Sequence, residues 1–292
     1  MSAPSSSTKA GARDSARVTF EELARRKDAD LDVPLGAALI ARDVYPDLDV
    51  ASLLEQLDTL AAPLFSARLE LLPAEEQAAV VSDLLFGTLG FRGNETDYYD
   101  PKNSLLSDVL TRRVGIPLTL AIVFCEVARR VGVPARGVGF PGHFLVRIER
   151  AGRVEPPLVI DPFYAGKVLG EDELRTRLER AIGQTDAGSL ESHLAPATPR
   201  AILLRMLTNL KAIYITRNER ARAHLAVDRI ACLLPNAAGP LVERAMLAVH
   251  LGARESARSD LTRALSLGPT DGEERIIRAE LAKLAKTTSS LN

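Results

Sequence analysis

The feature that most constrains the fold is an abrupt change of hydrophobic period in the middle of the chain. Within residues 118–124 only Thr119 carries a polar side-chain group, so this segment is typical of a helix buried nearly all round. Pro117 suits the first position of this helix, where a missing N–H has no consequence. Gly132 predicts the end of the helix, and an extended pattern follows it. The chain therefore requires a buried central helix followed by a sheet.

Three short strands are predicted after this helix, at residues 136–140, 144–148 and 158–162. His143 starts the second strand and Asp161 ends the third. In an antiparallel meander these two side chains lie close together. An aspartate in that position fixes the tautomer of the imidazole and raises its basicity, as the third member of a catalytic triad does.

Helical sequence surrounds this central block. Leucines spaced three and four residues apart predict packed helices over residues 17–88, where we find no chemistry. Residues 1–16 are biased towards Ser, Ala and Gly and contain no apolar run, so we expect a disordered leader and no signal peptide.

The C-terminal third shows an internal repeat. Pro235 and Pro269 stand 34 residues apart, the period of a helix–turn–helix repeat. Counting back from each proline gives matching small or apolar residues: Leu207 with Leu241, Ala223 with Ala257, Val227 with Leu261, and Ile230 with Ala264. The pattern is similar to two tetratricopeptide repeats, at about 204–237 and 238–271, followed by a capping helix.

The repeats favour a role in binding. Solenoids of this type generally bind peptide or protein on a concave face. Arg244 stands where an apolar residue is usual, which predicts an imperfect second repeat. A plain helical hairpin that only supports the central block is the alternative.

Composition excludes several classes of function. The net charge is −1, aromatic residues make up 4% of the chain, and tryptophan is absent, which disfavours nucleic-acid binding. No apolar run approaches the ~20 residues that span a bilayer. Cys125 and Cys232 lie far apart in the sequence, so we expect no disulfide, and we expect a cytoplasmic protein.

Four motifs carry a family resemblance: residues 91–95 (FRGNE), 98–104 (YYDPKNS), 113–117 (RVGIP) and 141–147 (PGHFLVR). With them the chain resembles the transglutaminase-like fold, related to papain-like proteases, and more narrowly the bacterial SirB-type transglutaminase-like proteins. The resemblance covers about residues 30 to 285. It implies an α+β protein with a helical N-terminal region (17–88), a transglutaminase-like core (89–197) and tetratricopeptide-like repeats (198–287).

The resemblance also implies which residues form the superfamily's Cys-His-Asp triad. The cysteine of active members stands at the start of the buried helix, where the helix dipole lowers the pKa of its thiol. Pro117 occupies that position here, while His143 and Asp161 match the other two members. Cys125 lies about 12 Å further along the helix, at ~1.5 Å per residue, and is expected to be a small buried hydrophobe. Thr119 is expected to cap the first turn.

We therefore predict a non-catalytic protein- or peptide-binding or regulatory module that needs no cofactor and no metal. The loop from Asn94 to Asn103 is expected to pack over the site, and the possible ligand-facing residues are Asn94, Tyr98, Asn103 and Thr119. The alternative is a hydrolase or acyltransferase of altered mechanism that uses His143 as base and Asp161 to orient it. A third hypothesis gives the repeats a role in self-association only.

Overall fold

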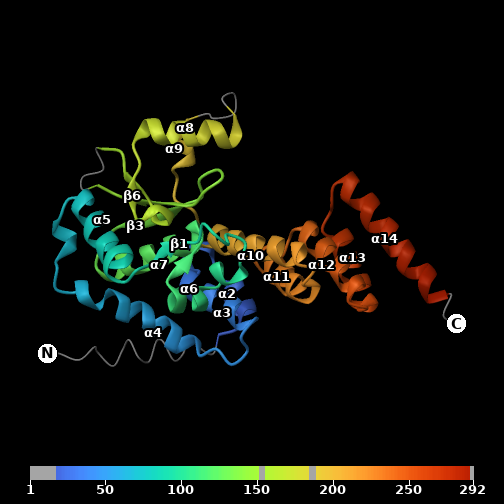
Figure 1. Cartoon of the computed structure of the whole chain (residues 1–292). Helices are drawn as coiled ribbons and strands as arrows, with labels where there is room; N and C mark the ends of the chain where they lie inside the picture. Colours follow the sequence, from blue (N-terminus) through green and yellow to red (C-terminus); the bar gives the residue numbers. More distant parts are fainter. Residues whose placement is uncertain (1–17, 151–154, 184–188, 290–292) are drawn as a thin grey trace. The chain divides into compact units, whose positions relative to one another are not determined.

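The computed structural model describes residues 18–150, 155–183 and 189–289 (Figure 1). The predicted leader at residues 1–16 lies outside these ranges. The described residues form two compact units, one within Lys27–Met206 and the other made of Thr19–Arg26 with the chain from Leu207 onward. The first helix thus belongs with the repeats. The boundaries 17–88, 89–197 and 198–287 remain predictions of domain limits.

Two helices of the first unit start at aspartate caps. The carboxylate of Asp32 accepts the Leu35 N–H at 3.0 Å ahead of α3 (Val33–Arg42). The carboxylate of Asp49 caps the N-terminus of α4 (Val50–Ala61) in the same way. Within the helical region predicted over residues 17–88, the last helix is α5 (Ala74–Ser82), which continues as a π-helical turn, η4 (Asp83–Thr88). Shorter turns are η1 (Asp28–Asp30), η2 (Ala62–Leu64), η3 (Leu69–Leu71), η5 (Pro101–Asn103) and η7 (Pro162–Tyr164).

The buried helix predicted from the apolar run is α7 (Pro117–Arg130), and its residues from Pro117 to Phe124 are all buried. It follows α6 (Leu106–Arg112) and packs against α4 and the sheet. Two short strands, β1 (Arg92–Gly93) and β2 (Val114–Gly115), pair in parallel beside its start.

The sheet is an antiparallel meander in the order β3 (Ala135–Val138), β4 (Leu145–Ile148), β5 (Leu158–Asp161) and β6 (Lys167–Val168). The three predicted strands are therefore present, and the short β6 adds a fourth. The prediction that His143 starts the second strand was wrong, because β4 begins at Leu145. Gly152, at which the sequence predicts the turn between the second and third strands, lies outside the described residues.

The two faces of the sheet pack against different helices, as the period of two along a strand requires. One face carries Val138, Leu145 and Val159, which pack against α8 (Glu171–Ile182) and α9 (Leu190–His193). Alternate residues such as Val146 and Ile160 are also fully buried. Both faces are thus covered, and Figure 1 shows α8 and α9 in yellow beside the sheet.

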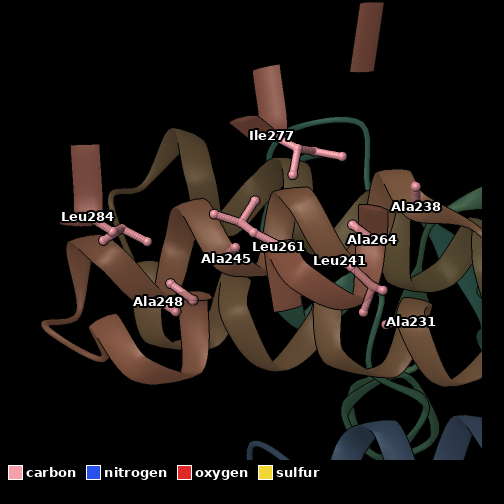
Figure 2. Close-up of a cluster of buried hydrophobic side chains, with 10 residues drawn as sticks. Ala231, Ala238, Leu241, Ala245, Ala248, Leu261, Ala264, Ile277 and Leu284 are labelled. Carbon is pink, nitrogen blue, oxygen red and sulfur yellow. The ribbon is translucent and has the colours of Figure 1, made fainter. Parts of the chain in front are cut away.

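The second unit is a helical array. It contains α2 (Phe20–Ala24), α11 (Arg220–Leu233), α12 (Ala238–His250), α13 (Arg254–Ser266), α14 (Asp271–Ser289) and the end of α10 (Pro199–Thr216). Alanines and leucines at the repeat positions, among them Leu261 and Ala264, form its core (Figure 2). Small side chains let paired helices approach closely, which explains the predicted match of Ala223 with Ala257; both are fully buried.

Arg244 is not a defect of the second repeat. It makes a bidentate pair with Asp260 (Nε–Oδ2 2.7 Å, Nη2–Oδ1 2.5 Å) and a further bond to Asp228. The three side chains come from α12, α13 and α11, so one guanidinium connects three successive helices. The hydrogen bond to Asp260, helped by the charges of both aspartates, raises the pKa of Arg244 against the opposing effect of burial. No helix in the described ranges is both long and apolar enough to cross a bilayer.

Candidate functional site

A tight turn positions His143. The N–H of His143 donates to the Phe140 carbonyl at 3.0 Å, and Gly142 has φ of +71°. Proline at the second position and glycine with positive φ at the third are the pattern of a type II turn, so the Pro141–Gly142 pair dictates this geometry. The imidazole therefore stands on a rigid hairpin end, and its side chain is 20% exposed.

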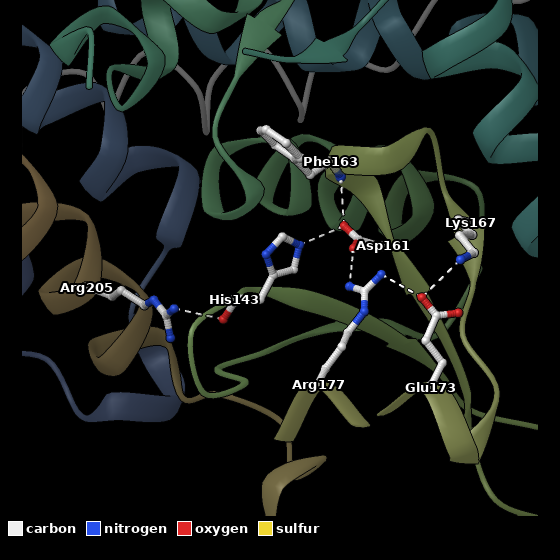
Figure 3. Close-up of polar contacts among 7 residues, drawn as sticks. All are labelled: His143, Asp161, Phe163, Lys167, Glu173, Arg177 and Arg205. Carbon is white, nitrogen blue, oxygen red and sulfur yellow. Dashed lines mark hydrogen bonds and ion pairs between the residues drawn. The ribbon is translucent and has the colours of Figure 1, made fainter. Parts of the chain in front are cut away.

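Asp161 meets that imidazole from the neighbouring strand. The Nε2 atom of His143 lies 2.9 Å from Oδ1 of Asp161, which confirms the prediction that the two side chains are adjacent (Figure 3). The same oxygen accepts the Phe163 N–H at 3.1 Å and so begins the η7 turn. Asp161 is fully buried. Among the described residues the other ring nitrogen of His143, Nδ1, has no hydrogen-bond partner.

Arg177 also binds this aspartate. Arg177 of α8 donates to Oδ2 of Asp161 at 2.7 Å and to Glu173 at 2.8 Å, and Lys167 bonds the same glutamate oxygen. Burial by itself raises the pKa of Asp161, but the bonds and charges of His143 and Arg177 outweigh it and hold that pKa below its ordinary value. Asp161 therefore stays ionised and orients the imidazole.

Aromatic rings enclose the pair on the side of the η7 turn. The His143 ring stacks on Tyr164 (centroids 6.4 Å apart) and meets Phe163 edge-on at 6.1 Å. Tyr98 contacts Phe163 at 6.1 Å, so the loop containing Tyr98 does approach the site. Tyr98 is 40% exposed, and of the four residues predicted to face a ligand it is the one with an exposed side chain next to these rings.

The other three, Asn94, Asn103 and Thr119, lie inside the protein. Asn94 donates to Asn103 at 3.1 Å, and Asn103 donates to the Asp97 carbonyl at 2.7 Å. The hydroxyl of Thr119 accepts the Ile116 N–H at 3.1 Å and donates to the Asn103 carbonyl at 2.7 Å. The expected capping role of Thr119 is therefore confirmed. These side chains fix the loop and the start of α7 rather than face a ligand, because Asn103 and Thr119 have no exposed surface.

The two residues considered for the nucleophile position differ in their surroundings. Pro117 is the buried first residue of α7. Cys125 lines a cavity of about 630 Å³ together with Ile122 and Phe144. Neither His143 nor Pro117 lines this cavity. Burial raises the pKa of the Cys125 thiol far above its ordinary value, so this thiol resists ionisation.

Sequence reasoning missed Arg177 and Arg205. Arg205, on α10, donates from Nη2 to the carbonyl of His143 at 2.7 Å, and its guanidinium lies over the Phe144 ring at 5.4 Å. Arg177 follows Asp161 by 16 residues and Arg205 follows His143 by 62. These separations cross several elements, and no local pattern in the sequence signals such contacts.

One cluster in the second unit has a composition that could hold a metal ion. Ligand atoms of Glu21, Asp228 and Cys232 lie within 4.8 Å of one another. The carboxylates already bond arginines, Glu21 to Arg229 and Asp228 to Arg244. These bonds satisfy the negative charge that would attract a cation, so we assign no site there.

Comparison with known proteins assigns the family. Residues 51–208 match the model described as the transglutaminase-like superfamily. The chain belongs to this superfamily. Residues 210–282 match the tetratricopeptide repeat model, which confirms the predicted repeats and, with the structure, the predicted α+β fold class.

Relatives in bacteria share nearly the whole architecture. The UPF0162 protein of Xylella fastidiosa is 41% identical over 271 residues, 91% of this chain and 94% of that protein. UPF0162 protein PA3419 of Pseudomonas aeruginosa is 31% identical over 255 residues, 87% and 91% of the two chains. This transglutaminase-like protein is thus a UPF0162 family member. F-box only protein 21 of mouse is 31% identical over 180 residues, 59% of this chain and 28% of that protein. No solved structure matches the chain.

Proposed function

We propose that this UPF0162 protein is a non-catalytic binding module of the cytoplasm that holds a protein or peptide partner at the corner built around His143. One observation carries the proposal. Among the described residues, no cysteine, serine or threonine side chain is hydrogen-bonded to His143. A nucleophile activated by a histidine has to lie within hydrogen-bond reach of it.

The position of Pro117 supports the same conclusion. In this proposal Pro117 replaces the superfamily's cysteine, as the resemblance to SirB-type proteins also implies, and a proline side chain has no group that attacks a carbonyl. Neither alternative residue compensates for this, because Thr119 is sealed inside and the thiol of Cys125 is held protonated. The tetratricopeptide repeats add a second surface of the peptide-binding type.

A broad screen with ester, amide and isopeptide substrates tests the proposal. The wild type, His143→Ala and Asp161→Asn are all expected to give the rate of buffer alone. Hydrolysis or acyl transfer by the wild type that His143→Ala abolishes would overturn it.

The second candidate is a hydrolase or acyltransferase of altered mechanism. The specific observation in its favour is the intact pair, with Nε2 on a buried aspartate and Nδ1 without a protein partner among the described residues. A histidine in that state is able to accept a proton from a bound water or hydroxyl. In this case Asp161→Asn would lower the rate while the fold persists.

Self-association through the repeats is the third hypothesis, and light scattering of the full chain decides it. A mass near the 31.5 kDa of one chain at all concentrations would exclude it.

A further inference from the structure

The corner around His143 contains a cation without a counter-charge. Arg205 is half-buried, and its one hydrogen bond to the described residues is to the neutral carbonyl of His143. No acidic side chain in the described ranges forms an ion pair with it. Arg177, the other arginine of the site, is held by Asp161 and Glu173. Arg177 is thus neutralised by carboxylates, whereas Arg205 has no counter-ion among the described residues and is the arginine available to bind an anion.

Burial without a partner disfavours the charge of Arg205. Burial lowers its pKa, and the interaction with Tyr98 acts in the opposite direction without reversing this. Burial raises the pKa of the Tyr98 phenol, and the charge of Arg205 partly offsets this increase. The two groups are therefore close enough to interact, and an anion bound between them would restore the missing counter-charge.

Geometry leaves the guanidinium accessible. A guanidinium has five N–H donors in a planar fork, and the bond to the His143 carbonyl uses a single donor of Arg205. A Cβ added at the exposed Gly139 would lie 3.8 Å from Nη1 of Arg205 and within 4 Å of nothing else. Gly139 therefore keeps the approach to Nη1 open, while the Phe144 ring fixes the plane of the guanidinium from one side.

Two further polar groups nearby also lack protein partners. Nδ1 of His143 and the hydroxyl of Tyr98 form no hydrogen bond within the described part of the chain. Both belong to the aromatic cluster around Phe163. Figure 3 shows Arg205 and the imidazole on the two sides of the His143 backbone.

We propose that Arg205, with the Tyr98 hydroxyl, binds a carboxylate of the peptide partner beside His143. The planar guanidinium matches a carboxylate in bidentate geometry, and this match gives orientation as well as affinity. The carboxylate belongs either to the C-terminus of a peptide or to an aspartate or glutamate side chain. This inference rests on the proposed function, since it names the chemistry that the binding corner recognises.

Nuclear magnetic resonance on the full chain tests the inference with defined probes. N-acetyl-tetra-alanine as the free acid is expected to shift the Arg205 Nε–H and Gly139 N–H signals in a saturable way. The same peptide as its C-terminal amide is expected to shift neither. An amidated peptide with one glutamate distinguishes the two sources: shifts comparable to those of the free acid indicate a side-chain carboxylate, and weaker ones a C-terminus.

Matched variants separate charge from fold. Arg205→Gln should weaken binding of the free acid at least about tenfold, the loss expected for a hydrogen bond between charged groups. Arg263→Gln, at an exposed arginine of α13, removes the same charge elsewhere and should bind as the wild type does. Gly139→Ala adds a Cβ in ordinary contact with Nη1 and should weaken binding less than Gly139→Val does. Gly139→Val should weaken it, because the added methyl groups occupy the approach to Nη1 while Arg205 stays in place.

Three results would overturn the inference: equal shifts by acid and amide, unchanged binding by Arg205→Gln, or shifts with inorganic phosphate alone and none with any peptide. The inference would also be overturned if no probe shifted any signal. Equal binding of acid and amide would leave the proposed binding function intact. Activity in the substrate screen would instead overturn the proposed function and leave carboxylate binding standing.

Discussion

Replacing Arg244 by methionine tests how the repeat helices are held together. The substitution keeps most of the volume of the side chain and removes its charge. Among the described residues, it leaves Asp260, whose side chain is 8% exposed, without a counter-ion, and Asp228, at 29%, with its contact to Arg229 at 3.6 Å.

The magnitude follows from this burial. Removing one partner from a fully buried ion pair costs about 3–5 kcal/mol. Water reaches the 19% exposed side chain of Arg244 and the more exposed Asp228, which reduces the loss. We expect Arg244→Met to lower the free energy of local unfolding by about 2–3 kcal/mol.

Native-state hydrogen exchange followed by mass spectrometry measures this loss where it occurs. Peptides from α11, α12 and α13 should exchange faster, because their opening free energy falls. Arg258→Met is the matched control, since within the described ranges that exposed arginine pairs with the exposed Glu255 alone, and its effect should stay below about 0.5 kcal/mol.

A double variant identifies the cause of the loss. Arg244→Met combined with Asp260→Leu removes the buried unpaired charge and should recover at least half of the lost free energy. If Arg244→Met leaves the exchange of these helices unchanged or slows it, the reasoning is refuted. The three-helix ion cluster would then be a surface feature without energetic weight.

Three further predictions concern the first unit. The pKa of Asp161 lies below its ordinary value of 3.8, so its stabilising contribution is complete above that value and is lost as pH falls through the lower folded-state pKa. In urea unfolding from pH 7 to pH 2, the difference in free energy of unfolding between wild type and Asp161→Asn should therefore shrink at the acidic end. A difference independent of pH would contradict this. Thr119→Val removes two buried hydrogen bonds and leaves the Ile116 N–H and the Asn103 carbonyl with the long 3.4 Å bond between them. It should lower the free energy of unfolding by about 1–3 kcal/mol, whereas a neutral result in chemical denaturation would show that the hydroxyl is dispensable. In Pro117→Cys the new thiol at the helix start should react with iodoacetamide at least about tenfold faster than Cys125, and equal labelling by mass spectrometry would argue against Pro117 as the former nucleophile position.

Local patterns in the sequence predicted much of this fold and part of the site. The apolar run after Pro117 predicted α7, and the strand pattern, with Asp161 at its end, was sufficient to place that carboxylate beside His143. The type II turn before His143 follows from the pair of residues that precedes it. Such features depend on neighbours along the chain, and a single sequence contains them.

Contacts between distant elements could not be predicted in this way. Arg205 reaches His143 from 62 residues away, and Arg244 looked like a misplaced polar residue because its partners lie on other helices. In the sequence Asn103 looked like an exposed polar loop residue, yet it is fully buried. Its amide can be buried because it donates a hydrogen bond to a backbone carbonyl of its own loop, which water would otherwise bind. Charge or polarity alone does not reveal whether a side chain finds a partner.

The hydrogen bond between Nε2 of His143 and Asp161 also determines which edge of the imidazole faces outward and what it offers there. An ionised aspartate only accepts, so a neutral ring carries its proton on Nε2 and presents a bare lone pair at Nδ1. At the same residue, Arg205 bonds the main-chain carbonyl and presents groups that only donate. Around His143 the site thus offers a hydrogen-bond acceptor, Nδ1, and hydrogen-bond donors, the N–H groups of Arg205. The last residue of a peptide, with its amide N–H next to its carboxylate, is complementary to these two groups.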